Sequence, residues 1–146
     1  MKIRVYLDNC CLNRPFDEPL TTLVRLEAEA KLHIQHQIRA GKIELAWSFM
    51  LDHECADNPH EDRSKAIDPW KYRAVVDIGA DEDVFRQALI IKKCGIPDAD
   101  AIHIACAIKA QCRYFLTTDK RILRKRVEGV ALLNPVDYIQ QVEGER

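Results

Sequence analysis

Strand-like and helix-like segments alternate along the whole chain, and this alternation restricts the folds open to it. Short apolar runs suited to buried strands are separated by longer segments in which apolar residues recur every three or four positions. Parallel strands need helical crossovers of this kind between them. The pattern therefore predicts an α/β fold, a three-layer α/β/α sandwich around a central, mostly parallel sheet of four to five strands. We expect strands at residues 3–7, 43–47, 75–78, 114–117 and 130–133, and helices at residues 20–40, 48–58, 81–93 and 99–110 and from residue 120 onward.

Composition sets limits on function. The 146 residues suffice for one domain, residues 1–146, and no linker, repeat or low-complexity segment divides them. The formal net charge of −1 excludes an overall polycation, so any surface for nucleic acid must be local. No apolar run approaches the roughly 18 residues of a membrane-spanning helix, so we expect no membrane association and a cytoplasmic protein. The six cysteines lack the spacing of a zinc site and are interpreted as free thiols.

Acidic residues follow or adjoin several of these elements. Asp8 ends the first strand, and Asp119 follows the fourth. Glu54 and Asp100 lie in helices that leave the same edge of the sheet, where α/β proteins collect their ligands. Two carboxylates about 4 Å apart repel by about 4 kcal/mol at an effective dielectric constant of about 20. Four together therefore need protons or a cation, and oxygen ligands without paired histidines or thiolates favour Mg²⁺ or Mn²⁺.

The motifs that carry these acids resemble, in order and spacing, those of the PIN domains, small metal-dependent nucleases that include VapC-type toxins. They are VYLDN at residues 5–9, SFMLDHE at residues 48–54, DAIHIA at residues 100–105 and LTTD at residues 116–119. The resemblance covers most of the chain. Asn9 departs from the pattern, because many members have Thr or Ser at that place. Asp52 and Asp98 are rival acids beside the second and third motifs.

The resemblance implies a divalent-metal-dependent endoribonuclease. Asp8 and Asp100 would hold the central metal position, and Asp119 would bind the ion directly or through water. Glu54 would be a ligand or would orient the attacking water. Asn9 and Thr118 would fix the rotamers of the carboxylates. His103, one turn after Asp100, either assists the reaction or, as we favour, packs as a hydrogen-bonded core residue.

Positive charge beside the last acid suits an RNA substrate. Lys120, Arg121 and Arg124 follow Asp119, and Arg14 lies in the loop beyond the first strand. These side chains are candidates for phosphate contacts, on which nucleic-acid affinity largely depends. The alternative is a solvated helix whose late cations interact with its own dipole.

Two further expectations concern partners, and one rival function stays open. The resemblance implies a toxin-antitoxin pair, with an antitoxin protein as partner. The helix at residues 20–40 carries apolar residues on more than the one face that packs on the core. This distribution suits a homodimer, although core packing alone explains it as well. The rival function is a PIN-like module that binds RNA or a protein without cleaving RNA.

Overall fold

Five strands form one parallel sheet in the order β3-β2-β1-β4-β5. The computed structural model describes residues 2–12, 21–56 and 69–144 of the chain. The sheet confirms the expected α/β fold and its five strands. The strands are β1 (Arg4–Leu7), β2 (Glu44–Ser48), β3 (Val76–Ile78), β4 (Tyr114–Leu116) and β5 (Ala131–Leu133).

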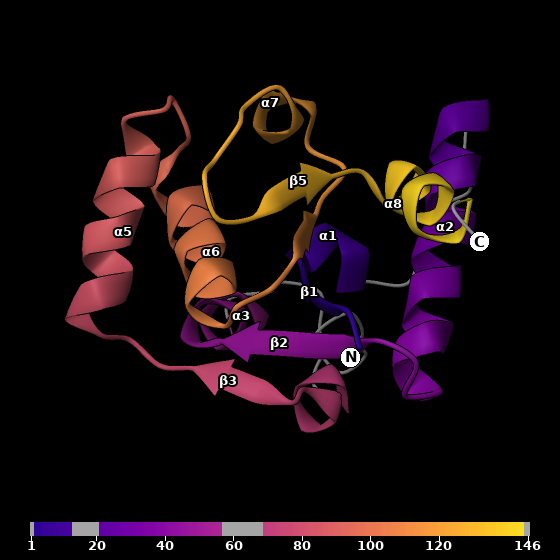
Figure 1. Ribbon diagram of the computed structural model, residues 1–146, viewed down its shortest axis with the longest axis horizontal. Coiled ribbons are helices and arrows are strands. Elements are labelled where there is room, and N and C mark those ends of the chain that lie inside the picture. The colour runs from indigo at the N-terminus through magenta and orange to yellow at the C-terminus, as the bar shows by residue number, and fades with distance from the viewer. Residues whose placement is uncertain (1, 13–20, 57–68, 145–146) are drawn as a thin grey trace.

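Helices cover both faces of this sheet, which gives the three layers. In Figure 1, α2 (Thr22–Arg39) and α8 (Pro135–Glu143) pack together on one side. On the other side, α6 (Asp98–Lys109) packs against β2 and β4 and also against α3 (Phe49–Ala56) and α5 (Glu82–Lys92). None of the described helices has the length and apolarity needed to cross a membrane.

The core of the sheet is aromatic and aliphatic. Tyr6 and Phe115 lie opposite each other on β1 and β4, with stacked rings whose centroids are 5.4 Å apart. Trp47 is 1% exposed, and its indole N–H is satisfied because it donates to Asp52 Oδ1 at 2.9 Å. All six cysteines are free thiols, as expected.

Most helix ends follow from local side chains. Asp81 Oδ1 accepts the Val84 N–H at 2.8 Å, as the acidic run there predicts. Gly41 ends α2 in the left-handed region with φ of 73°. The sequence also predicts Asp98 as the N-cap of α6. This prediction is wrong, because Asp98 is the first helical residue and Pro97 is the cap, without a side-chain hydrogen bond.

Some of the described helices lie where no helix is expected. One is α1 (Asn9–Leu12), directly after β1, and another is α8 at the end of the described chain. Asn134 caps α8 by accepting the Val136 N–H at 2.8 Å, with Pro135 in the first turn. The sequence also predicts one charged helix after residue 60, a position that lies outside the described residues.

The strand order places the first and fourth strands side by side. The chain adds β2 and β3 on one side of β1, then crosses through α5 and α6 to add β4 and β5 on the other side. The reversal of strand order therefore falls between β1 and β4. At such a point the helices that follow the two strands diverge, so ligand sites form beyond the carboxyl ends of the strands.

Candidate metal centre

Asp8 and Asp119 are joined through the hydroxyl of Thr117, across the boundary between β1 and β4. Thr117 Oγ1 donates to Asp8 Oδ2 at 2.8 Å and accepts the backbone N–H of Asp119 at 3.1 Å. Thr117 is fully buried directly after β4. The backbone N–H of Asp8 donates to the Leu116 carbonyl at 3.0 Å, which ties the two chain segments together. The ends of the two strands therefore hold both acids at one edge of the sheet.

Asp100 lies in the first turn of α6 and experiences the charge of both these acids. Burial raises the pKa of its carboxyl, and the negative charges of Asp8 and Asp119 raise it further. Asp119 differs, because hydrogen bonds from Arg121 lower the pKa of its carboxyl. The acids of the first, third and fourth motifs thus interact electrostatically although they are far apart in the sequence.

Glu54 belongs to a second, mostly buried network. Its Oε1 pairs with Nε2 of His103, whose side chain is 1% exposed. His103 Nδ1 bonds the Tyr6 hydroxyl at 2.6 Å, and that hydroxyl bonds Ser48 Oγ, also at 2.6 Å. Ser48 Oγ accepts the Leu51 N–H at 3.4 Å. The network therefore connects β1, β2, α3 and α6.

One direction of donation satisfies every member of this network with a neutral imidazole. The Leu51 N–H donates to Ser48, Ser48 to Tyr6, and Tyr6 to Nδ1 of His103, whose Nε2–H then donates to Glu54. Burial raises the pKa of Tyr6 well above its ordinary value, so the phenol keeps its proton. The hydrogen-bonded core role favoured for His103 agrees with this geometry.

The residues expected to fix the carboxylates act differently from the prediction. Thr118 donates to Cys10 Sγ at 3.4 Å, so the role expected of it falls to Thr117. Asn9 fixes Asp8 through its backbone, whose N–H donates to Oδ1 at 2.8 Å. The side-chain Oδ1 of Asn9 is buried and accepts no hydrogen bond from any residue that the structure describes.

The rival acids have cationic partners of their own. Asp52 Oδ1 accepts from Lys71 Nζ at 3.0 Å as well as from the indole of Trp47. Asp98 is well exposed and pairs with Lys92 at 2.7 Å. Both acids therefore have ion-pair partners, whereas Asp8 and Asp100 have none among the residues that the structure describes.

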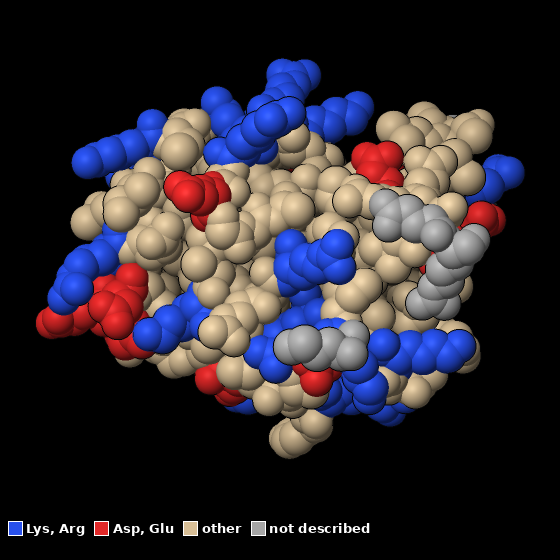
Figure 2. Space-filling model, in the orientation of Figure 1, with Lys and Arg blue, Asp and Glu red and all other residues tan. Residues whose placement is uncertain are grey.

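The expected substrate-binding cations divide into two groups. Arg121 donates three hydrogen bonds to Asp119, from Nη2 to Oδ2 at 3.1 Å, from Nε to Oδ1 at 3.4 Å and from its backbone N–H to Oδ1 at 2.9 Å, so it neutralises that acid. Lys120 and Arg124 are exposed and, among the described residues, have no acidic partner. Figure 2 shows Lys and Arg side chains gathered around α7 (Lys120–Leu123), at the top of the view. Arg14 lies outside the described residues.

Sequence reasoning missed several residues of these networks. Tyr6 lies on β1, and Asp8 directly follows that strand. A side chain with a polar tip in an otherwise apolar strand was the signal that could have drawn attention to Tyr6. Cys10 was expected to be an inert thiol. Its Sγ lies 3.8 Å from Asp8 Oδ2, and a hydrogen bond from Cys11 lowers its pKa to about 7.

The carboxylates interact without forming a closed cage. Among residues 2–12, 21–56 and 69–144, no three His, Cys, Asp or Glu side chains lie close enough together to hold a metal ion between them. The interaction of Asp8, Asp100 and Asp119 is therefore long-range and electrostatic rather than a set of shared short contacts.

Comparison with known proteins shows a similarity of fold. No protein-family model matches the chain, and no curated protein matches it. A chain in the crystal structure of VapBC2 from Rickettsia felis bound to a DNA fragment from their promoter is similar, with a TM-score of 0.57 at 11% sequence identity. The match covers 90% of this chain and 98% of that chain. The likeness is one of fold. It extends over nearly the whole sheet-and-helix arrangement described above.

Proposed function

We propose that this protein is a divalent-metal-dependent endoribonuclease that hydrolyses RNA phosphodiester bonds. The observation that carries the proposal is the interaction of three carboxylates beyond the sheet, where burial and then the charges of Asp8 and Asp119 raise the pKa of Asp100. Like charges gathered in this way are unfavourable until a cation or protons neutralise them. The motif resemblance to PIN domains and the fold shared with a VapBC2 chain support the same chemistry.

The donor atoms present are of the chemical type that Mg²⁺ and Mn²⁺ prefer. Asp8, Asp100 and Asp119 offer oxygens only, and the neighbouring Oδ1 of Asn9 is a buried oxygen without a described donor. In the proposal Asp8 and Asp100 hold the ion, and Asp119 binds it directly or through water. When bound, such an ion supplies positive charge that polarises a phosphate and lowers the pKa of a water. Thr117 orients Asp8 for this role through its hydrogen bond to Oδ2.

Glu54 acts in this proposal on the water rather than on the ion. His103 occupies one oxygen of its carboxylate and fixes its direction, and His103 is itself fixed by Tyr6. The second oxygen remains for a water that approaches the phosphate. Lys120 and Arg124 contact the flanking phosphates, while Arg121 stays with Asp119.

Cleavage assays with matched variants test the proposal. Purified protein with Mn²⁺ should cleave members of a broad RNA panel, and EDTA should abolish cleavage. Asp8→Asn and Asp100→Asn should also abolish it. Asp98→Asn, two residues from Asp100 in the same helical turn, should cleave like the wild type. Cleavage that persists in EDTA or in Asp8→Asn would overturn the proposal.

A toxin role and two partners form part of the same proposal. We expect expression of the chain to arrest growth, and a small antitoxin protein to copurify with it and silence cleavage. We expect a homodimer as well, with exposed apolar side chains on α2 such as Leu26, which is 47% exposed, available for a second copy. Normal growth on expression alone would contradict the toxin role, and a monomer by light scattering would contradict the dimer.

A second candidate function is a PIN-like module that binds RNA or a protein without cleaving it. The observation that favours this candidate is the absence, among the described residues, of a closed group of metal ligands. The pairing of Glu54 with His103 and of Asp119 with Arg121 points the same way, because both acids already have partners. Binding of RNA without cleavage in the presence of Mn²⁺ would select this function.

A further inference from the structure

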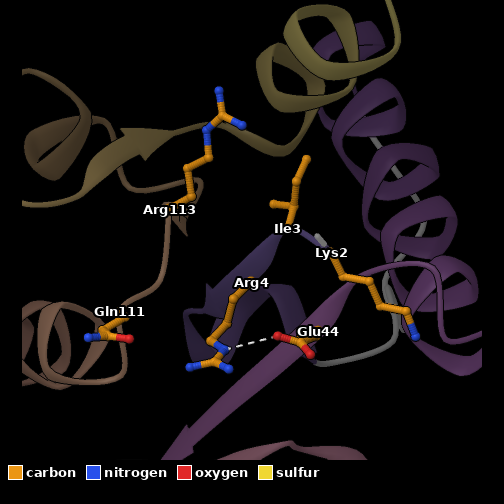
Figure 3. A pocket seen from close by; sticks show the side chains of 6 residues that line it. All are labelled: Lys2, Ile3, Arg4, Glu44, Gln111 and Arg113. Atoms are coloured by element: carbon orange, nitrogen blue, oxygen red, sulfur yellow. Dashed lines mark hydrogen bonds and ion pairs between the residues drawn. The ribbon is translucent and has the colours of Figure 1, made fainter.

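A separate hollow lies at the opposite edge of the sheet, where the strands begin. It has a volume of about 420 Å³, within the usual range for ligand sites. Its walls come from the start of β1, the start of β2 and the turn that leads into β4, as Figure 3 shows. The lining residues are Lys2, Ile3, Arg4, Glu44, Gln111 and Arg113.

The charge of this hollow is unbalanced. Three of its side chains are cationic, and only Glu44 opposes them. Arg4 Nε donates to Glu44 Oε1 at 3.1 Å, so this acid is already paired. Lys2 and Arg113 have no acidic partner in the described part of the chain, where the ion pairs of Lys and Arg involve other residues. An anion entering the hollow therefore meets two uncompensated positive charges.

Arg4 is fixed in position at the centre of the hollow. Besides Glu44, it bonds the Ala110 carbonyl through Nη1 at 2.7 Å, and its side chain is half-buried. A guanidinium held in this way keeps its remaining N–H groups in a fixed fork, which lowers the entropy lost when it binds an anion. Figure 3 shows the Arg4 side chain between Gln111 on one side and Lys2 on the other.

The turn before β4 is held just as firmly. Gln111 has φ of 60°, in the left-handed region, as the Schellman residue that ends α6. The Arg113 N–H donates to the Arg4 carbonyl at 2.9 Å, and the Arg113 guanidinium lies over the Tyr114 ring, 5.3 Å from its centroid. The backbone thus presents Arg113 from a rigid strand start.

The cations extend beyond this hollow. A second hollow of about 340 Å³ shares Lys2 and Ile3 with the first and adds Lys42, together with the paired His33 and Glu143. In Figure 2, Lys and Arg side chains gather in the lower centre of the view, around the place where Figure 1 marks the N-terminus. The positive charges are therefore spread along a strip rather than aimed at one point.

We propose that this strip binds phosphate groups carried along one molecule, such as a nucleoside polyphosphate or a single-stranded nucleic acid. Separated cations favour several linked phosphates, and in Figure 3 the side chains of Arg4, Lys2 and Arg113 point in three different directions. The planar guanidinium of arginine can donate two parallel hydrogen bonds to phosphate oxygens, and the ammonium of lysine adds a compact positive charge. The strip is distinct from the candidate metal centre, because β1 separates Arg4 from Asp8 by about 13 Å at a rise of about 3.3 Å per residue.

Titration with pyrophosphate in EDTA, followed by amide chemical shifts of the full-length chain, tests the proposal. We expect saturable shifts at Lys2–Arg4 and at Gln111–Arg113, with a dissociation constant below about 1 mM. Asp8→Asn should bind pyrophosphate as the wild type does, so failure of the nuclease proposal leaves this result unaffected. The proposal would be overturned if these amides did not shift, or if the only shifts occurred around the candidate metal centre at Asp8.

Charge reversal provides the matched comparison. Lys2→Glu combined with Arg113→Glu changes two exposed side chains and should weaken pyrophosphate binding by about tenfold or more. Arg25→Glu reverses one charge on the exposed face of the first turns of α2, away from the hollow, and should leave binding unchanged. Circular dichroism checks the fold of each variant. If the double variant binds pyrophosphate as tightly as the wild type, the assignment is contradicted. The chemical-shift map of the wild type tests the proposal even if a variant fails to fold.

Three ligands then identify the source of the phosphates. ATP, a single-stranded RNA without a terminal phosphate and a poly-glutamate peptide are each titrated into the protein, at the same concentration of negative charge. The RNA titration uses the Asp8→Asn protein. Stronger binding of ATP indicates a nucleotide, and stronger binding of RNA indicates a nucleic-acid strand. Equal or stronger binding of the peptide would overturn the assignment to phosphate.

Discussion

Thr117 shows how one small side chain can organise two acids. Its hydroxyl is fully buried and uses both its donor and its acceptor, toward Asp8 Oδ2 and the Asp119 N–H. A buried hydroxyl with both functions satisfied stabilises the fold and also sets the direction of the Asp8 carboxylate. A neighbouring threonine cannot substitute, because Thr118 donates to Cys10 instead.

Thr117→Val tests this interpretation, because valine keeps the shape and removes the hydroxyl. We expect a loss of about 1–3 kcal/mol in the free energy of unfolding, since the Asp119 N–H and an oxygen of Asp8 lose their partner. Urea denaturation measures the loss. Thr117→Ser keeps the hydroxyl and should lose less, so an equal loss in both variants would show that packing and not hydrogen bonding matters here.

The raised pKa of Asp100 predicts a pH-dependent effect on stability in the metal-free protein. Because its pKa is higher folded than unfolded, the folded chain binds more protons, and stability falls as pH rises from about 4 through the folded pKa. Asp100→Asn removes this penalty. In EDTA we expect the variant to melt about 2 °C above the wild type at pH 7, a small gain because the side chain is partly exposed.

The same variant gives its own control at low pH. Below the unfolded pKa, Asp100 is protonated in both states of the wild type, so the difference in Tm should vanish near pH 3. A difference that persists unchanged at pH 3 would show that the substitution acts through packing rather than through charge.

At the scale of elements, the buried network joins two strands and two helices through one phenol. Tyr6→Phe should lower the free energy of unfolding by about 1–3 kcal/mol, because Ser48 and Nδ1 of His103 each lose a buried partner. Chemical denaturation measures the change. Tyr72→Phe removes a hydroxyl from a side chain that is 89% exposed and should leave the free energy of unfolding unchanged. If Tyr6→Phe were as stable as Tyr72→Phe, the stabilising role of the network would be contradicted.

The ends of α2 and α6 provide a matched pair of helix terminations. Both close with Schellman hydrogen bonds, around Gly41 in α2 and Gln111 in α6, and both residues are in the left-handed region. Gln111→Gly should raise stability by about 0.5–1 kcal/mol, because the Cβ strain disappears. Gly41→Gln should lower stability by a similar amount. Thermal melts of both variants check the pair, and changes of the same sign would contradict this reasoning.

Elements could be predicted from the sequence where their signals are local. The apolar period of residues 20–40 depends on neighbours in the chain, and α2 matches the prediction within two residues at each end. Gly41 and Asp81, which end α2 and cap α5, likewise act on neighbouring residues. The helix α8 was missed although Asn134 and Pro135 form a start signal, because no strand follows to give the helix a place in the alternation.

The candidate site could be predicted only in part, for a physical reason. Asp8 and Asp119 follow from their positions after parallel strands, since the carboxyl ends of such strands share one edge. The pairing of Glu54 with His103 depends on how α3 and α6 are rotated against each other, which no local pattern specifies. The choice of Thr117 over Thr118 depends on the residue at which β4 ends.

For the whole molecule, metal binding decides between the nuclease and the binding module. A ligand that binds only the folded state at a hundred times its dissociation constant adds about 2.7 kcal/mol to stability. We therefore expect Mn²⁺ to raise the Tm of the wild type and of Asp98→Asn by several degrees, and to leave Asp8→Asn and Asp100→Asn unchanged. Differential scanning calorimetry in chelated and Mn²⁺-loaded buffer measures this. An unchanged wild-type Tm would favour the binding module, whereas an equal rise in Asp8→Asn would place the ion away from these carboxylates.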